Sequence, residues 1–176
     1  MTQTHVPECI FHTRQRNGAL GGDNPYEWKE LSTRDVFAGK RVVLFALPGA
    51  FTPACSESHL PGYERLYDQI IAQGIDAVIC LAVVDAFVMF QWAKALNITK
   101  VQMLPDGNGD FTRQMGMLVQ RHSQGMGLRS WRYSMLVEDG AILQLFAEPG
   151  RRDNPPGVPL QISAAEVMLD YLQRRH

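Results

Sequence analysis

Residues 41–63 read RVVLFALPGAFTPACSESHLPGY and carry the strongest indication of the fold in this chain. It opens with the apolar, β-branched run from Arg41 to Leu47, which stops at a Pro-Gly pair as a central strand of an α/β sheet does. A helix is expected next, because Thr52 can serve as its N-cap and Pro53 takes the first helical position, where a missing N–H costs nothing. Cys55 therefore falls in the first turn of a helix, facing backbone N–H groups that lack a partner within that helix.

The rest of the chain continues the alternation of strands and helices. We expect Pro61-Gly62 to interrupt the first helix, and a second helical segment to run from Tyr63 to Gly74. A strand at 77–84, a helix at 86–96, a strand at 101–104 and a short helix at 111–117 should follow. A connection at 118–131 that contains several glycines then leads to a hairpin of strands at 133–137 and 141–146. Ser163 is expected to cap a final helix, with Glu166 completing a capping box. This order predicts an α/β protein with a mixed central sheet and helices on both faces, as in a thioredoxin-like fold. Periodicity alone does not separate that fold from other small α/β sandwiches.

Length and composition exclude several classes of protein. The 176 residues show no linker or internal repeat, so we expect one domain over residues 1–176. A net charge of -1 gives no reason to expect a nucleic acid or an acidic membrane as partner. The longest apolar runs fall far short of the roughly 18 residues of a membrane span, and the N-terminus does not resemble a secretory signal. Three scattered cysteines fit neither a disulfide framework nor a zinc site, and free thiols suit a cytoplasmic protein.

The position of Cys55 favours thiolate chemistry. A free thiol with a pKa of about 8.5 is only about 3% ionised at pH 7, and the N–H groups and macrodipole of a helix start favour the anion. Reduction of a peroxide also needs hydrogen-bond donors aimed at its oxygens, and Thr52 offers a hydroxyl three residues before the cysteine. Pro48 has no N–H and can shield the thiolate from water. We interpret this segment as a preorganised site for an anion and an oxyanion.

Residues 48–55 resemble the active-site segment of the peroxiredoxin family, whose pattern P-x-x-x-T-x-x-C is met by Pro48, Thr52 and Cys55. The segments PGAFTPACSESHLPGY, VVDAFVMFQWAK, LPDGNGDFTRQMGM and RSWRYSMLVEDG extend the resemblance over nearly the whole chain, to the atypical type-five branch and especially to members fused to a glutaredoxin domain. The R-[YF]-[SA] signature of the family falls on Arg132, which the resemblance places beside the cysteine and the peroxide. The implied catalytic residues are thus Cys55, Thr52, Arg132 and Pro48.

The resemblance also implies the reaction and the partners. The substrates would be hydrogen peroxide and alkyl hydroperoxides, reduced through a Cys55 sulfenic acid without metal, haem, flavin or nicotinamide. No cysteine follows Cys80, so the enzyme is expected to be of the one-cysteine type, recycled by glutathione and glutaredoxin; thioredoxin is an alternative reductant. Family members form dimers, which implies a homodimer.

Several residues leave alternatives open. Cys80 lies in an apolar strand and is expected in the core, whereas Cys9 is either incidental or a resolving thiol. Arg129 competes with Arg132 for the peroxide. His59 follows Cys55 by four residues, so the two could form the Cys–His pair of a hydrolase, but a structural hydrogen bond is the better expectation. A redox sensor or holdase on the same scaffold is the non-enzymatic alternative.

Overall fold

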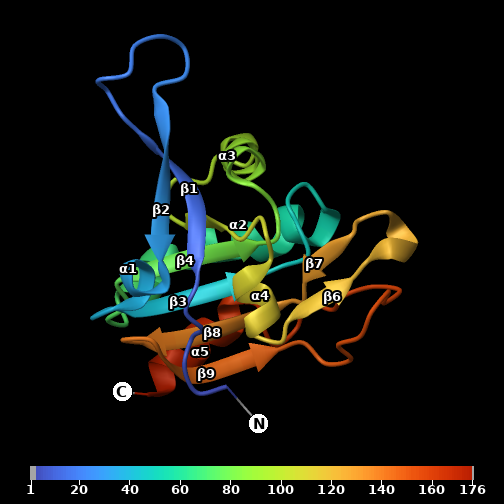
Figure 1. Cartoon of the computed structure of the whole chain (residues 1–176). Helices are drawn as coiled ribbons and strands as arrows, with labels where there is room; N and C mark the ends of the chain where they lie inside the picture. The colour runs from blue at the N-terminus through green and yellow to red at the C-terminus, as the bar shows by residue number, and fades with distance from the viewer. Residues whose placement is uncertain (1–2, 176) are drawn as a thin grey trace.

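The protein is built on a five-stranded mixed sheet with the strand order β5-β4-β3-β8-β9 (Figure 1). The computed structural model describes residues 3–175. The strands of this sheet are β3 (Arg41–Ala46), β4 (Ala77–Ala82), β5 (Gln102–Pro105), β8 (Tyr133–Glu138) and β9 (Ala141–Ala147). The first three are parallel, while β8 runs antiparallel to β3 and β9 antiparallel to β8. The mixed sheet predicted from the sequence is confirmed, including the closing hairpin.

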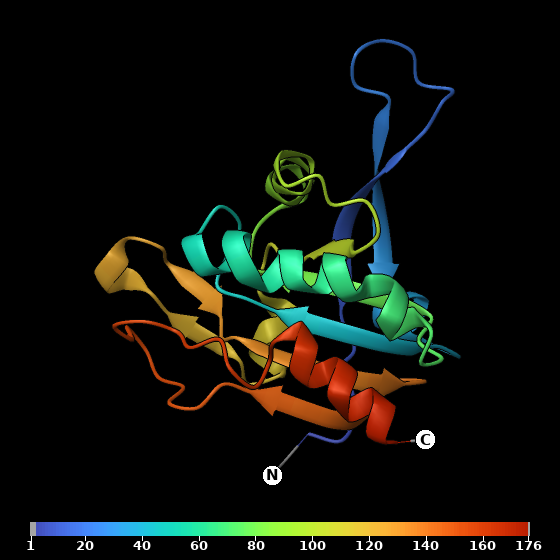
Figure 2. The ribbon, with the colours of Figure 1, turned by 180° about the vertical axis from the view of Figure 1, so that it is seen from behind.

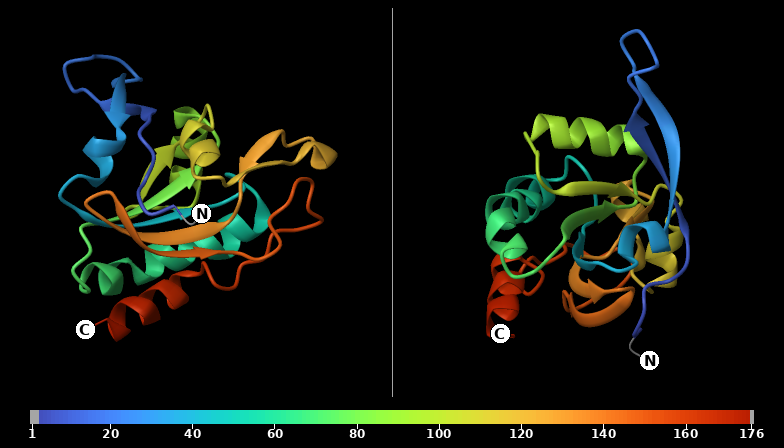
Figure 3. Two further views of the ribbon diagram at one scale, coloured as in Figure 1. Left: turned by 60° about the horizontal axis from the view of Figure 1, so that its bottom comes forward. Right: turned by 90° about the vertical axis from the view of Figure 1, so that its left-hand side faces the viewer.

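Helices cover both faces of the sheet. The helices are α1 (Thr33–Phe37), α2 (Leu60–Ile71), α3 (Ala86–Ala95), α4 (Asp110–Gln114) and α5 (Ala165–Arg174). Side chains alternate across β3, so that Phe45 packs in the cluster that contains residues of α2, α3 and α5, and Leu44 packs with residues of α1 and α4. Figure 2 shows α2 and α5 side by side on the first of these faces, and the left view of Figure 3 shows the sheet above them. None of the helices within residues 3–175 is long and apolar enough to cross a membrane.

The helix that contains Cys55 is not interrupted at Pro61, so that prediction is wrong. Residues Cys55–His59 form a π-helical turn that runs directly into α2, and the N–H of Leu60 donates to the carbonyl of Cys55. In a regular α-helix a proline leaves one carbonyl without its donor and crowds the turn before it. The wider π turn accommodates Pro61 near the start of α2 without breaking the helix.

Two hairpins were not foreseen from the sequence. The strands β1 (Ile10–Arg16) and β2 (Tyr26–Ser32) pair antiparallel, and the loop between them projects from the body of the molecule (Figure 1). The segment expected to be an irregular connection forms β6 (Leu118–Gln120) and β7 (Leu128–Ser130), which also pair antiparallel around a short 3₁₀ turn. Both hairpins are short or polar, so their strand periodicity is weak.

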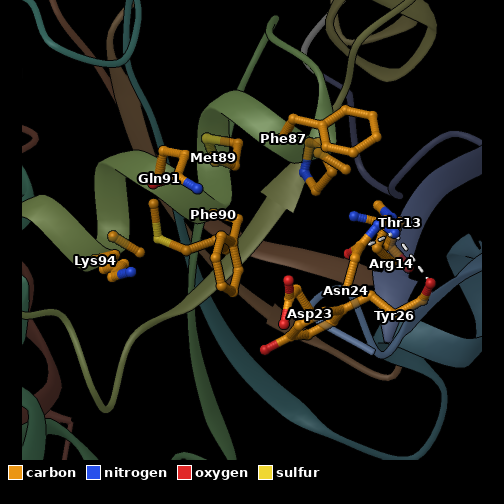
Figure 4. Close-up of a pocket in the computed structure, with 14 residues that line it drawn as sticks. Thr13, Arg14, Asp23, Asn24, Tyr26, Phe87, Met89, Phe90, Gln91 and Lys94 are labelled. Carbon is orange, nitrogen blue, oxygen red and sulfur yellow. Dashed lines mark hydrogen bonds between the residues drawn. The ribbon is translucent and has the colours of Figure 1, made fainter. Parts of the chain in front are cut away.

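Aromatic contacts fasten the first hairpin to α3. Tyr26 packs edge-on against Phe90 with ring centroids 5.3 Å apart, and the guanidinium of Arg14 lies 4.6 Å from the centre of the Phe87 ring. A hollow of ≈ 570 Å³ remains between the hairpin and α3 (Figure 4). Its walls include none of the residues Pro48, Thr52, Cys55 and Arg132.

The start of α5 also differs from the prediction. Its N-cap is Ala164, which has no side-chain acceptor, and the expected capping box is absent. The hydroxyl of Ser163 donates instead to Glu148, and Glu166 forms an ion pair with Arg65. Both side chains that sequence spacing assigned to the cap are thus engaged by residues distant in the chain.

Candidate active site

A tight turn carries the chain from the end of β3 to Cys55. Pro48 and Gly49 are buried, and the Thr52 hydroxyl donates to the carbonyl of Gly49 at 2.7 Å. The carbonyl of Thr52 accepts the N–H of Ser56 at 3.0 Å, which starts the helix. Thr52 therefore occupies the helix start through its backbone, but its side chain braces the turn and does not act as the predicted N-cap. Phe51 adopts a left-handed conformation with φ 61°, a strained geometry for a bulky residue.

Cys55 lies in the π-helical turn and its side chain is buried. Only 1% of the residue is exposed, and it packs in the cluster of α2, α3 and α5. Its neighbour Ser56 accepts a hydrogen bond from the indole N–H of Trp92 at 3.0 Å, which ties this turn to α3. Cys55 therefore lies in the first turn of a helix, as the sequence predicted.

Arg132 brings a buried positive charge to the same helix. It lies between β7 and β8, is 2% exposed, and donates from Nη1 to Nδ1 of His59 at 3.0 Å. Its Nε is also buried and has no hydrogen-bond partner among residues 3–175. Within the same residues, Arg132 forms no ion pair with a carboxylate. A buried cation with an unused donor is unusual in a folded protein and marks a candidate binding site for an anion or an oxygen ligand.

His59 is a neutral, structural residue. Its Nε2 lies 3.1 Å from the carbonyl of Ser163, while Nδ1 faces Arg132. A carbonyl can only accept and a guanidinium can only donate, so Nε2 carries the hydrogen and Nδ1 accepts. Burial, followed by the charge of Arg132, lowers the pKa of His59 from 6.5 to about 3. Both ring nitrogens of His59 are engaged, so the expected structural hydrogen bond is confirmed. His59 therefore has no ring nitrogen available to act as the general base of a Cys–His hydrolase.

This low pKa predicts a loss of stability in mild acid. Below pH 6.5 the unfolded chain binds a proton at His59 that the folded protein excludes until the pH approaches about 3. We expect the free energy of unfolding to fall by about 2 kcal/mol between pH 7 and pH 5 for this reason. Urea unfolding at both values should show a smaller fall for His59→Gln, with the exposed His122→Gln as control. An unchanged pH dependence in His59→Gln would contradict the assignment.

Arg129, the alternative candidate for contact with the peroxide, binds the backbone of the turn that begins at Pro48. Its Nε donates to the carbonyl of Met126 at 2.9 Å and its Nη1 to that of Pro48 at 3.3 Å. The side chain is half-buried; burial and the charge of Arg121 lower its pKa, and the charge of Cys55 opposes this shift. A methyl group at Gly49 would collide with Nη1 of Arg129, so a side chain at this position would displace the guanidinium from where it now lies. The structure thus brings both arginines to the segment around Cys55, in different roles.

The other two cysteines are poor nucleophiles. Cys80 is fully buried in β4, and burial, assisted by the charge of Cys55, raises the pKa of its thiol well above the usual value. Cys9 is half-buried against Thr33, and burial raises the pKa of its thiol to about 11. The core location predicted for Cys80 is confirmed.

Glu148 is a buried carboxylate that no sequence pattern indicated, and only 2% of the residue is exposed. Its carboxylate accepts from the N–H of Gln161 and from both the N–H and the hydroxyl of Ser163. Its backbone N–H donates to the carbonyl of Arg132 at 3.0 Å. A charged residue in a loop rich in glycine and proline is ordinarily exposed, so there was no reason to expect from the sequence that Glu148 is buried.

Several known proteins are similar to this chain over most of its length. The Redoxin family model matches residues 25–159. The chain is 54% identical over 173 residues to "Peroxiredoxin sll1621" of Synechocystis, covering 98% of this chain and 92% of that protein. It is 44% identical over 171 residues to "Hybrid peroxiredoxin hyPrx5" of Haemophilus influenzae, covering 97% of this chain and 66% of that protein. The structure of the Plasmodium falciparum antioxidant protein, a "1-Cys peroxiredoxin", superposes with a TM-score of 0.90 at 31% identity over 99% of both chains.

These matches span the strands, the helices and the turn that holds Cys55, and they confirm the thioredoxin-like fold. The likeness to the hybrid protein and to a solved peroxiredoxin 5 supports the type-five branch expected from the sequence. The chain belongs to the peroxiredoxin family, the thiol peroxidases.

Proposed function

We propose that Cys55 is the peroxidatic residue and reduces hydrogen peroxide and alkyl hydroperoxides. Its thiolate attacks one oxygen of the peroxide, so that an S–O bond forms and the O–O bond breaks. The departing oxygen takes a proton and leaves as water or alcohol, and Cys55 is oxidised to a sulfenic acid. The observation that carries the proposal is the buried Cys55 in a helical first turn, followed on the same helix by His59 bonded to the buried Arg132.

Arg132, Thr52 and Pro48 are proposed to prepare the peroxide for attack. The charge of Arg132 has no carboxylate partner within residues 3–175, and a Cys55 thiolate would compensate it. Its free Nε–H can donate to a peroxide oxygen as negative charge develops there. The Thr52 hydroxyl, which now donates to Gly49, keeps its lone pairs for a donor such as a peroxide O–H. Buried Pro48 limits the access of water. No metal or organic cofactor takes part in the proposed reaction.

Recycling is proposed to use an external thiol. Cys80 is buried with a raised pKa and Cys9 also has a raised pKa, so neither thiol is poised to attack a sulfenic acid. Glutathione would form a mixed disulfide with Cys55, which glutaredoxin resolves. The resemblance to peroxiredoxins fused to glutaredoxin and the likeness to a protein described as a one-cysteine peroxiredoxin support this scheme. Because Cys55 is 1% exposed, its π-helical turn must open locally to admit glutathione.

Mass spectrometry after one equivalent of hydrogen peroxide tests this scheme. We expect a sulfenic acid on Cys55 that converts to a glutathione adduct when glutathione is added and is released by glutaredoxin. A Cys9–Cys55 or Cys55–Cys80 disulfide as the main product, turned over by thioredoxin alone, would refute the one-cysteine scheme and leave the peroxidase proposal intact. If each protein molecule consumed only one equivalent of peroxide with every thiol system tested, the result would favour a redox sensor or holdase over a catalytic peroxidase.

A further inference from the structure

We infer that Glu148 is a positioning residue for the peroxide site, because it fixes Ser163 and through it the hydrogen bond between His59 and Arg132. This inference rests on the proposed role of Arg132. The four residues form a closed ring of hydrogen bonds that starts and ends at Arg132. They come from the β8 entrance, the end of β9, the loop before α5 and the helix that carries Cys55.

In the first part of the ring, the Glu148 carboxylate binds the loop before α5. Oε1 of Glu148 accepts from the N–H of Gln161 at 2.7 Å, from the N–H of Ser163 at 2.9 Å and from the Ser163 hydroxyl at 2.7 Å. Hydrogen bonds to an ionised acceptor are stronger than those to a neutral one. Three such donors on one buried oxygen fix the backbone of Ser163, and hence the direction of its carbonyl.

The second part of the ring transmits this direction to Arg132. The carbonyl of Ser163 accepts from the hydroxyl of Tyr63 at 2.9 Å and from Nε2 of His59 at 3.1 Å. Because this acceptor places the imidazole hydrogen on Nε2, the lone pair of Nδ1 is left facing Arg132. The other tautomer would point an N–H at Nη1 of Arg132 and repel it. The orientation of the guanidinium therefore depends on where the Ser163 carbonyl points.

The third part of the ring is made by the backbone of Glu148. Its N–H donates to the carbonyl of Arg132 at 3.0 Å, and its carbonyl accepts from the indole N–H of Trp131 at 2.7 Å. Arg132 is consequently held at its backbone by Glu148 directly and at its side chain by Glu148 through two other residues. Glu148 thus contacts the backbone of Arg132 through its own N–H, and its carboxylate reaches the Arg132 side chain through Ser163 and His59.

The substitution Glu148→Gln tests the inference, with Glu166→Gln as matched control. Glu166 is exposed and, among residues 3–175, pairs with Arg65 alone, so its substitution removes the same charge without touching the ring. We expect the rate constant of Cys55 with hydrogen peroxide to fall by about 10- to 100-fold in Glu148→Gln, as a displaced catalytic group produces. Alkylation by iodoacetamide, which makes no use of oriented peroxide donors, should fall far less. Nitrogen chemical shifts of the His59 ring should show the Nε2–H tautomer in the wild type and a tautomer mixture in Glu148→Gln.

The outcomes separate the inference from the proposed function. A lower unfolding temperature with an unchanged tautomer and an unchanged ratio of peroxide to iodoacetamide rates would assign Glu148 a purely structural role and overturn the inference. If Arg132→Met leaves the peroxide rate intact, the proposed function of Arg132 fails instead. Should Glu148→Gln not fold, Glu148→Asp keeps the charge and shortens its reach by one methylene. The same tautomer and rate changes are expected there, and their absence in the folded protein would overturn the inference equally.

Discussion

Replacement of Cys55 by serine is expected to abolish catalytic peroxide reduction, with a loss on the order of 10⁴-fold or more. A serine hydroxyl at this position is neither ionised nor able to form the sulfenic acid on which the proposed cycle depends. The side chain is buried and similar in size, so the fold should persist. Steady-state peroxide consumption with glutathione and glutaredoxin, alongside thermal unfolding, measures both effects.

The other cysteines provide the controls for this experiment. Cys80→Ser places a hydroxyl in the core and should lower stability by roughly 1–3 kcal/mol while most of the activity remains. Cys9→Ala removes a half-buried thiol with a raised pKa and should leave activity nearly unchanged. If a folded Cys80→Ser lost as much turnover as Cys55→Ser, the assignment of the nucleophile would be wrong.

The substitution Arg132→Met is expected to slow the reaction of Cys55 with peroxide by about 10²- to 10³-fold, the cost of losing one preorganised donor. Methionine fills a comparable volume but carries neither the charge nor the unused Nε–H. Stopped-flow measurement with limiting peroxide isolates this step from recycling.

Arg129→Met is the matched comparison, because two hydrogen bonds to backbone carbonyls already use this guanidinium. We expect a smaller loss there, arising from a looser Pro48 turn. A larger effect of Arg129→Met than of Arg132→Met would mean that the other arginine contacts the peroxide.

The alternation of strands and helices was predictable because it depends on local patterns. The apolar run before Pro48 and the turn signals of the closing hairpin each report on a few neighbouring residues, and the structure confirms the elements they predicted. Local patterns failed where a distant partner took over a side chain. Ser163 is held by Glu148, and Glu166 by Arg65, so neither caps α5.

The amino-acid sequence alone predicts that Cys55 lies at a helix start, that a mixed sheet supports it and that the chain resembles the peroxiredoxins. Those features follow from residues adjacent in the chain, or from motifs that keep their spacing. The three-dimensional arrangement was needed to show that His59 is neutral and accepts from Arg132, that Arg129 donates to the carbonyl of Pro48, and that a buried Glu148 connects Arg132 to His59 through Ser163. Burial and hydrogen bonds between segments 15 to 104 residues apart set the charge and direction of these side chains, and no local pattern records either.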